Sequence, residues 1–144
     1  MSDAVRLIVY HKQSTSARLR FLRFAGPTVC AFGALPRLAA VVDEAEMKRF
    51  DPSVVPHPAP LVGRMEKHLG LSAGSVVLDA DFLARVDVPD GPLTVYLAHF
   101  TTIDPPFAAA QAQGGEFIDL TQGRNLPPPE LELLRRVYSH VLGG

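Results

Sequence analysis

Three basic side chains lie close together between residues 60 and 71, namely Arg64, Lys67 and His68. Guanidinium, ammonium and imidazole groups bind phosphate oxygens, so this triplet is a candidate contact for a phosphorylated ligand. His99, within an apolar run, is a further candidate ligand-binding residue. The simpler interpretation is that the triplet is the solvated side of a helix and that His99 is a hydrogen-bonded core residue. The sequence leaves both interpretations open.

Acidic residues elsewhere suggest a different chemistry. Carboxylates are the ligands that Mg²⁺ and Mn²⁺ prefer, and ions held in this way offset phosphate charge and prepare a water nucleophile. The acids that could serve as alternative metal ligands are Glu44, Glu46, Asp79, Asp81 and Asp119. Glu44 and Glu46 also have a structural explanation, because acids are favoured near the positive end of a helix.

Several common catalytic motifs are missing from the chain. It has no Gly-x-x-x-x-Gly-Lys-Ser/Thr phosphate loop, no Gly-x-Gly-x-x-Gly fingerprint and no His-Glu-x-x-His pair. Cys30 is the only cysteine and lies in an apolar run, so we expect a buried small hydrophobe and no disulfide within the chain. No residue is assigned a catalytic role from the sequence.

The elements that must position these residues follow from hydrophobic periodicity. Leu61, Met65 and Leu69 recur every four residues and Gly70 stands where a left-handed residue ends a helix, so residues 60–71 are expected to be helical. Alternating residues predict a hairpin over residues 5–11 and 17–21. A clearer hairpin is predicted over 81–88 and 93–100, with Asp90 and Gly91 at its turn.

The remaining elements are shorter. We expect strands at 28–32, 35–42, 75–78 and 116–120, helical turns at 44–50 and 105–113, and a C-terminal helix whose core face is formed by Leu131, Leu134, Tyr138, Val141 and Leu142. Residues 51–60 contain four prolines and are expected to be a linker within a single domain, 1–144.

Composition narrows the classes of partner. The 144 residues carry a net charge of −1 and are 47% hydrophobic, so we expect no general nucleic-acid binding. No apolar run approaches the ~20 residues of a membrane span, and the N-terminus lacks the pattern of a secretion signal. A cytoplasmic protein that does not enter the membrane is therefore expected.

The order of these elements resembles the Nudix hydrolase fold, over nearly the whole chain. The resemblance implies an α+β fold with a mixed β-sheet sandwiched by helices and a C-terminal helix. In that family one helix carries the box Gly-x5-Glu-x7-Arg-Glu-U-x-Glu-Glu-x-Gly-U, where U is aliphatic. When its last Gly-U is placed on Gly70 and Leu71, the Arg-Glu-U-x-Glu-Glu part falls on residues 63–68, and Met65 fits the aliphatic position.

The acids of the box do not fit. Arg64, Lys67 and His68 stand at its glutamate positions, and the upstream Gly and Glu fall on Arg49 and Val55. Glu66 is one residue away, which on a helix is a rotation of about 100°, so it is expected to point away from the site. Nudix enzymes use those glutamates to hold Mg²⁺ or Mn²⁺ against a diphosphate, and cationic Lys67 cannot do this.

The resemblance therefore implies a Nudix-like domain with a degenerate box, no standard hydrolase activity and no metal cofactor. Its basic residues would bind a nucleotide or another phosphorylated ligand, or its pocket would be vestigial and a protein partner would matter instead. The alternatives are a divergent nucleotide diphosphate hydrolase with Mg²⁺ or Mn²⁺ on the acids named above, and an unrelated α+β binding fold. The resemblance also makes a homodimer an expectation.

Overall fold

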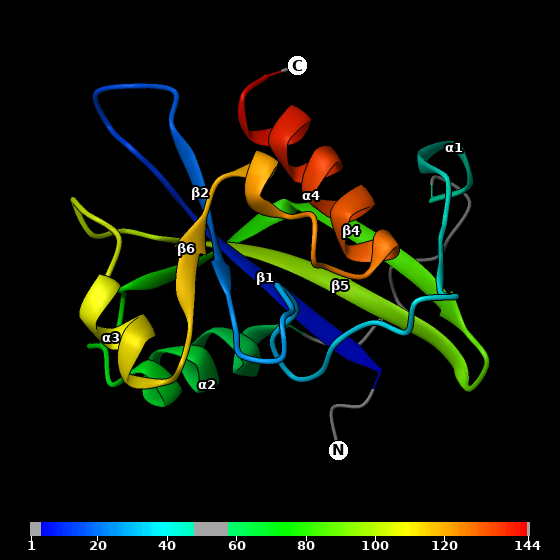
Figure 1. Cartoon of the computed structure of the whole chain (residues 1–144), viewed down its shortest axis with the longest axis horizontal. Helices are drawn as coiled ribbons and strands as arrows, with labels where there is room; N and C mark the ends of the chain where they lie inside the picture. Colours follow the sequence, from blue (N-terminus) through cyan, green and yellow to red (C-terminus); the bar gives the residue numbers. More distant parts are fainter. Residues whose placement is uncertain (1–3, 48–57, 144) are drawn as a thin grey trace.

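A mixed six-stranded β-sheet with helices on its faces dominates the computed structural model, which describes residues 4–47 and 58–143 (Figure 1). The elements in chain order are β1 (Val5–Lys12), β2 (Leu19–Arg23), β3 (Ala40–Val41), α1 (Glu44–Met47), α2 (Ala59–Leu69), β4 (Val76–Val88), β5 (Gly91–Phe100), α3 (Phe107–Ala112), β6 (Glu116–Ile118), the 3₁₀ helix η2 (Leu120–Gln122) and α4 (Pro128–Val141). The predicted α+β class, with a mixed sheet and a C-terminal helix, is confirmed.

The order of strands across the sheet is β3-β4-β5-β1-β2-β6. The central strands β1 and β5 are parallel, with Val5 opposite Thr94, and all other neighbours are antiparallel. The predicted hairpins β1–β2 and β4–β5 are both present. Because β1 lies inside the sheet and is covered on both sides, its consecutive residues Leu7, Ile8 and Val9 are all fully buried.

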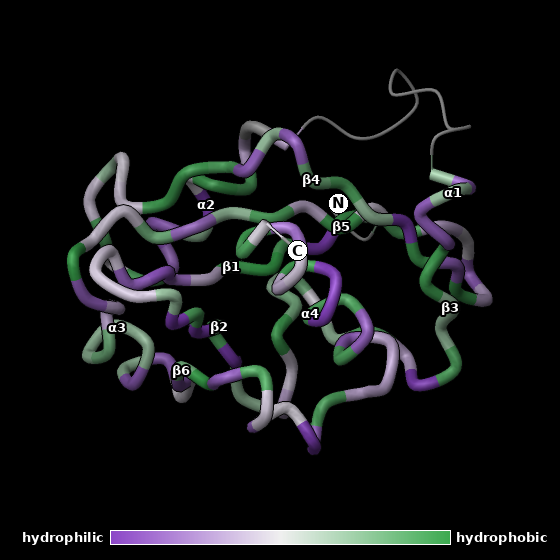
Figure 2. Tube along the Cα trace, turned by 90° about the horizontal axis from the view of Figure 1, so that it is seen from above, coloured by the Kyte–Doolittle hydropathy of each residue, from purple (hydrophilic) through white to green (hydrophobic). Residues whose placement is uncertain are grey.

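Two hydrophobic clusters flank the sheet. Leu133, Leu134 and Val137 of α4 belong to one cluster, and Leu61 and Met65 of α2 belong to the other. In Figure 1, α4 lies above the sheet and α2 below it. Figure 2, seen from above, agrees with Figure 1 in placing α3 and β6 at one end of the molecule and α1 and β3 at the other. The helices therefore form layers on opposite faces of the sheet.

Two of the shorter strand predictions are wrong over all or most of their length, and a third is a strand but not a separate one. Residues 28–32 are a loop joined to its neighbours by two isolated bridges, Leu7 with Ala31 and Phe24 with Thr28. Only Ala40–Val41 of the expected strand 35–42 is a strand. The expected strand at 75–78 is not separate, because β4 runs through Asp79–Asp81 with a shift in register between Leu78 and Leu83.

The boundaries of two helices also differ from expectation. The expected linker 51–60 lies mostly outside the described residues, and its last two residues belong to α2. In α4 the buried residues are Pro129, Glu130, Leu133, Leu134 and Val137, whereas Tyr138 is 40% exposed. The core face of α4 is therefore rotated from the predicted one, because packing against the sheet, and not apolar content alone, decides which side is buried.

No helix within residues 4–47 and 58–143 combines the length and the apolar character needed to cross a bilayer.

Candidate functional site

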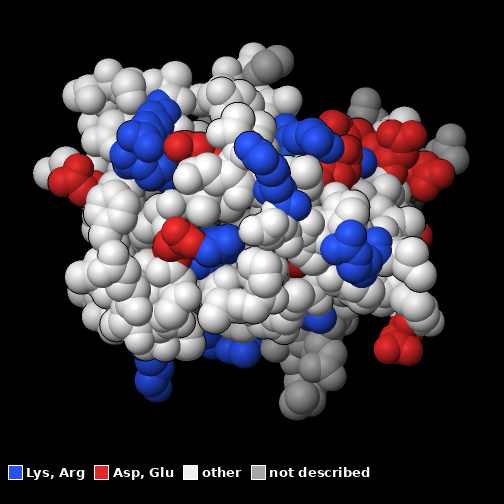
Figure 3. All heavy atoms as spheres, in the orientation of Figure 1, with Lys and Arg blue, Asp and Glu red and all other residues white. Residues whose placement is uncertain are grey.

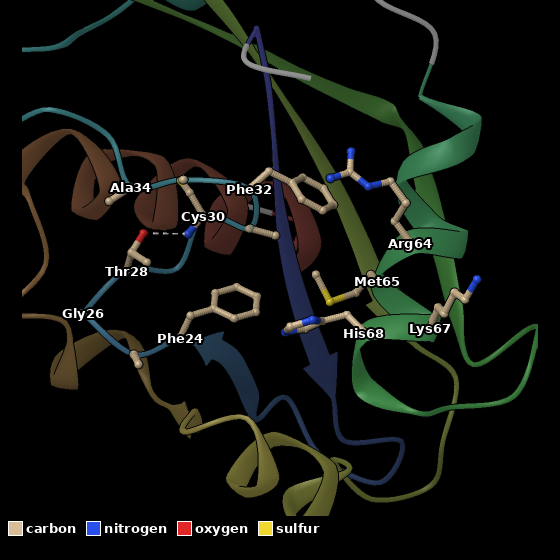
Figure 4. Close-up of a pocket in the computed structure, with 13 residues that line it drawn as sticks. Phe24, Gly26, Thr28, Cys30, Phe32, Ala34, Arg64, Met65, Lys67 and His68 are labelled. Atoms are coloured by element: carbon tan, nitrogen blue, oxygen red, sulfur yellow. Dashed lines mark hydrogen bonds between the residues drawn. The ribbon is translucent and has the colours of Figure 1, made fainter. Parts of the chain in front are cut away.

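A cavity of about 730 Å³ lies between α2 and the loop of residues 24–34 (Figure 4). We call it the α2 cavity. The loop contributes Phe24, Cys30 and Phe32, and α2 contributes Met65 together with the predicted residues Arg64, Lys67 and His68. Its volume is within the range of sites that bind small molecules. The structure therefore brings three of the four candidate ligand-binding residues together.

The packing of α2 explains why those residues reach the cavity. Leu61, Met65 and Leu69 are buried against the sheet, as their spacing predicts. The helix ends at Gly70, which has φ 69° and ψ 29°, and the N–H of Leu71 donates a 2.8 Å hydrogen bond to the carbonyl of Glu66. This is a Schellman motif, which fixes where the last turn stops. The cavity side of α2 is thus set by its apolar stripe.

The three basic residues are not equivalent. The guanidinium carbon of Arg64 lies 4.1 Å from the centre of the Phe32 ring, an arrangement that cation–π attraction favours. In Figure 4 the imidazole of His68 points into the cavity towards Phe24, whereas the ammonium of Lys67 points away from it. Arg64 and His68 are therefore the groups placed to contact a ligand, and Lys67 adds charge at the edge.

The loop opposite α2 is held by Glu130, which sequence periodicity does not single out. Glu130 lies in the first turn of α4 and is fully buried. Its carboxylate accepts hydrogen bonds from the hydroxyl of Thr28 at 2.7 Å and from the N–H groups of Val29 and Leu35, both at 2.9 Å. An acid after prolines is also the ordinary start of a helix, so the sequence carries no signal that this one would be buried.

Phe32 has a backbone conformation that ordinary residues rarely adopt. Its φ is 74°, and it is the only residue other than glycine with a positive φ within residues 4–47 and 58–143. Such a conformation costs of order 1 kcal/mol and persists when the surrounding structure enforces it. Val29 and Leu35 lie on either side of Phe32, and the hydrogen bonds that their N–H groups donate to Glu130 supply that restraint. The aromatic wall of the cavity is therefore preformed.

Cys30 contributes an uncharged side chain to the lining of the α2 cavity. It is 1% exposed, and burial raises the pKa of its thiol well above its usual value, with the negative charge of Glu130 adding to the effect and Arg6 opposing it. The thiolate is the nucleophilic form, so a protonated thiol at neutral pH acts as a small apolar group. The predicted burial of Cys30 is confirmed.

Glu66 is not among the residues that line the α2 cavity, and it has a structural role. It is 8% exposed, and its Oε2 accepts hydrogen bonds from the N–H of Gly74 at 2.8 Å and from the N–H of Val76 at 3.0 Å. These bonds join α2 to the start of β4. The carboxylate of Glu66 is therefore occupied in holding the backbone.

The fourth candidate, His99, lies in a second cluster with Asp79 and Tyr10. The Nδ1 atom of His99 is 2.5 Å from Oδ1 of Asp79, and the hydroxyl of Tyr10 donates a 2.5 Å hydrogen bond to Oδ2. Burial first, then the hydrogen bond and charge of Asp79, raise the pKa of Tyr10 well above its usual value. His99 is outside the α2 cavity. Because Val77 is the residue opposite His99, the alternation of β4 places Asp79 on the same face of the sheet as His99.

The other acids named as metal ligands do not all lie together, although Asp81 and Glu44 line the same cavity. Asp119 lies 3.3 Å from Arg18, and Asp81 lies 3.3 Å from His140 in a smaller cavity of about 290 Å³ that Glu44 also lines. Glu46 is exposed on α1, and acidic side chains gather at that end of the molecule in Figure 3. Among the described residues, no three His, Cys, Asp or Glu side chains are grouped to hold a metal ion.

One catalytic motif is present in the sequence but lacks the backbone geometry that it needs. Residues 70–74 read Gly-Leu-Ser-Ala-Gly, which matches the Gly-x-Ser-x-Gly of a nucleophile elbow. That elbow needs a strand followed by a helix, whereas here α2 ends before the serine and β4 begins after it. Ser72 Oγ lies 3.4 Å from Ser75 Oγ. The segment is therefore a helix-to-strand connection, and its geometry does not support a nucleophilic serine.

The sequence matches no protein-family model and no curated protein sequence.

Proposed function

We propose that this chain is a Nudix-like domain without standard Nudix hydrolase activity, and that it binds a phosphorylated small ligand in the α2 cavity. One observation carries the proposal. The residues at the glutamate positions of the box, Arg64, Lys67 and His68, all line the same cavity. In this position Arg64 and His68 offer N–H donors where a metal enzyme offers carboxylates, and Lys67 adds positive charge at the edge.

The charge of the cavity supports an anionic ligand. Among the described residues, those that line it include no Asp or Glu. Arg64 can donate two hydrogen bonds to one phosphate, and a histidine can donate a third. Direct contact of this kind neutralises a phosphate without a metal ion, and the same positive charge disfavours binding of Mg²⁺.

The hydrolase alternative has less support from the side chains. Each of its three aspartates has another partner: Asp79 with Tyr10 and His99, Asp81 with His140, and Asp119 with Arg18. Binding of a metal ion by any of these aspartates would compete with the contact that it makes here.

A thermal-shift experiment tests the proposal. The wild-type protein is heated with inorganic phosphate, glycerol 3-phosphate, phenyl phosphate or ADP, each with and without Mg²⁺. A ligand that binds only the folded state raises the melting temperature. We expect a rise that does not need Mg²⁺ and that is lost in the Arg64→Gln/His68→Gln double variant. The control is Arg135→Gln, an exposed arginine of α4 on the opposite face of the sheet, which should keep the full shift.

Two results would overturn the proposal. Turnover of ADP that requires Mg²⁺ or Mn²⁺ and is abolished by Asp81→Asn would establish the hydrolase alternative. An unchanged melting temperature with every phosphate compound, including the alkyl phosphates described below, would show that the cavity does not bind this class of ligand, and would favour a role in binding a protein partner.

A further inference from the structure

The walls of the α2 cavity are chemically one-sided. Among the described lining residues, basic groups occur only on α2, where Met65 adds apolar surface, whereas the loop side presents Phe24, Phe32 and a series of alanines and glycines. Cys30 adds a thiol that burial keeps protonated. A ligand that fills this space therefore meets charge at one end and apolar surface along its body.

The side chain of Thr28 is the one hydroxyl among the described lining residues, and its hydrogen bonds are already used. It donates to the carboxylate of Glu130 and accepts a 3.0 Å hydrogen bond from the N–H of Cys30. A nucleotide base carries several donors and acceptors, and burying them without partners is costly. The lining provides no side-chain amide to meet them. The wall opposite α2 is thus poorly suited to reading a base.

An apolar body meets none of these costs. Phe24 and Phe32 provide aromatic surface on the loop, and Met65 provides a flexible thioether that adapts to the shape of a ligand. The loop is held in place by Glu130 before any ligand arrives, so little conformational entropy is lost when the site is filled. We infer that the α2 cavity takes an amphipathic organic anion, in which a phosphate contacts Arg64 and His68 and an alkyl or aryl body lies between Phe24, Phe32 and Met65. This inference rests on the proposed function and narrows it to a class of ligand.

A homologous series measures the contribution of the body. Isothermal titration calorimetry is carried out with butyl, hexyl and octyl phosphate, which share one headgroup, and with glycerol 3-phosphate and ADP, whose bodies are polar. We expect affinity to rise about fourfold for each added methylene, the factor that corresponds to burying one CH₂ group. The heat capacity change should become more negative along the series, which is the signature of apolar burial. Glycerol 3-phosphate and ADP should bind more weakly than hexyl phosphate.

Variants separate the two ends of the ligand. Phe24→Ala should weaken octyl phosphate about tenfold and leave inorganic phosphate unchanged, because it shortens the apolar wall only. Phe107→Ala is the matched control, since Phe107 is a partly exposed phenylalanine on α3 outside the cavity lining. Phe24→Leu gives a smaller loss in the same direction, and it serves if the alanine variant does not fold. The Arg64→Gln/His68→Gln variant should weaken every phosphate in the panel.

The outcomes distinguish this inference from the broader proposal. Suppose that ADP or glycerol 3-phosphate binds as tightly as octyl phosphate, and that the Arg64→Gln/His68→Gln variant weakens both. The proposal of a phosphate site would then be supported, and the inference that the ligand has an apolar body would be wrong. An affinity that does not change with the length of the alkyl chain would also contradict the apolar body. If octanol binds as well as octyl phosphate, or if no compound binds at all, the phosphate contact itself is wrong and both statements fall.

Discussion

The carboxylate of Glu130 accepts a 2.9 Å hydrogen bond from the backbone N–H of Leu35, so the first turn of α4 is tied to a loop 95 residues earlier in the chain. The same carboxylate binds Thr28 and Val29. A fully buried acid is stable only when hydrogen bonds replace its water. These three partners explain its burial, and they make it the residue that holds the loop wall of the α2 cavity.

Replacing Glu130 should therefore cost more stability than its position on a helix suggests. In Glu130→Gln an amide NH₂ faces a backbone N–H that needs an acceptor, and we expect a loss of about 2 kcal/mol. Glu130→Leu leaves all three donors unpaired, with a loss of about 4 kcal/mol. Urea denaturation measures both changes, and the folded fraction of Glu130→Gln should also bind octyl phosphate more weakly than wild type.

The control for Glu130 is Glu132, two residues along the same helix. Its side chain is 48% exposed and lies 3.7 Å from Arg136. A long ion pair whose carboxylate is half exposed to water contributes little, so Glu132→Gln should change the free energy of unfolding by less than about 0.5 kcal/mol. Equal effects of the two glutamine variants would show that the Glu130 contacts do not hold the loop.

Two glycines of the α2 region should respond to alanine with opposite signs. Gly70 has a φ of 69°, and an added Cβ would meet no atom within 4 Å, so the cost of Gly70→Ala is that of the left-handed backbone, about 1 kcal/mol. Gly63 lies inside α2 and also has open space around it. Gly63→Ala should stabilise by about 0.5–1 kcal/mol, because alanine restricts the unfolded chain and favours helix.

Thermal or urea unfolding of the Gly70→Ala and Gly63→Ala variants measures the two changes in stability. A Gly70→Ala protein as stable as wild type would mean that the helix can end in another way, and the Schellman motif would then not be what fixes the cavity side of α2.

Local signals explain what the sequence predicts correctly. The stripe of Leu61, Met65 and Leu69 and the stop at Gly70 are both encoded within twelve residues. The β4–β5 turn is also a local signal, but it falls one residue earlier than predicted, on residues 89 and 90, because Gly91 already pairs with Val88 as the first residue of β5. Because Arg64, Lys67 and His68 share that helix, their closeness is predictable, and only their facing a cavity needed the structure. Hydrophobic periodicity indicates which residues share one side of a helix, and in α2 this indication is correct.

Long-range contacts explain what the sequence does not predict. The residues 28–32 have the apolar character of a strand, but Glu130 takes two of the loop's N–H groups, and the loop turns at Phe32. The meeting of Asp79 with His99 depends on the register between β4 and β5, and the face of α4 depends on the shape of the sheet it covers. Each of these features depends on residues that are far apart in the chain, so the pattern of a short segment does not predict them.

The only cysteine gives a direct probe of the cavity wall. Burial raises the pKa of Cys30 and encloses its sulfur, so the reactive thiolate is scarce in the folded protein. We expect a disulfide reagent such as DTNB to label the native protein at least about 100-fold more slowly than the urea-unfolded chain, because labelling must await opening. Rapid labelling in native buffer would show that the thiol is open to the cavity, and the wall of the α2 cavity would then be reactive instead of inert.

The hydrogen bond of Tyr10 to Asp79 predicts how stability changes at alkaline pH. An unfolded tyrosine loses its proton near pH 10, whereas burial and Asp79 hold the proton on Tyr10 in the folded protein well above that pH. The folded state therefore binds one more proton than the unfolded state, and the stability contributed by this group is lost as the pH rises above the unfolded pKa. Between about pH 9 and about pH 11 the expected loss is roughly 1.4 kcal/mol.

Tyr10→Phe removes that proton and so removes that part of the pH dependence. The variant should be less stable than wild type by about 1 kcal/mol at neutral pH, because it lacks the hydrogen bond to Asp79. The difference should shrink as the pH rises, since only wild type loses the linked contribution. Urea denaturation across the alkaline range measures the gap, and tyrosinate absorbance of the folded protein shows directly whether the wild type ionises one tyrosine more than the variant. A gap that stays constant, together with an extra ionisation in the folded wild type near pH 10, would mean that Asp79 does not hold the proton on Tyr10.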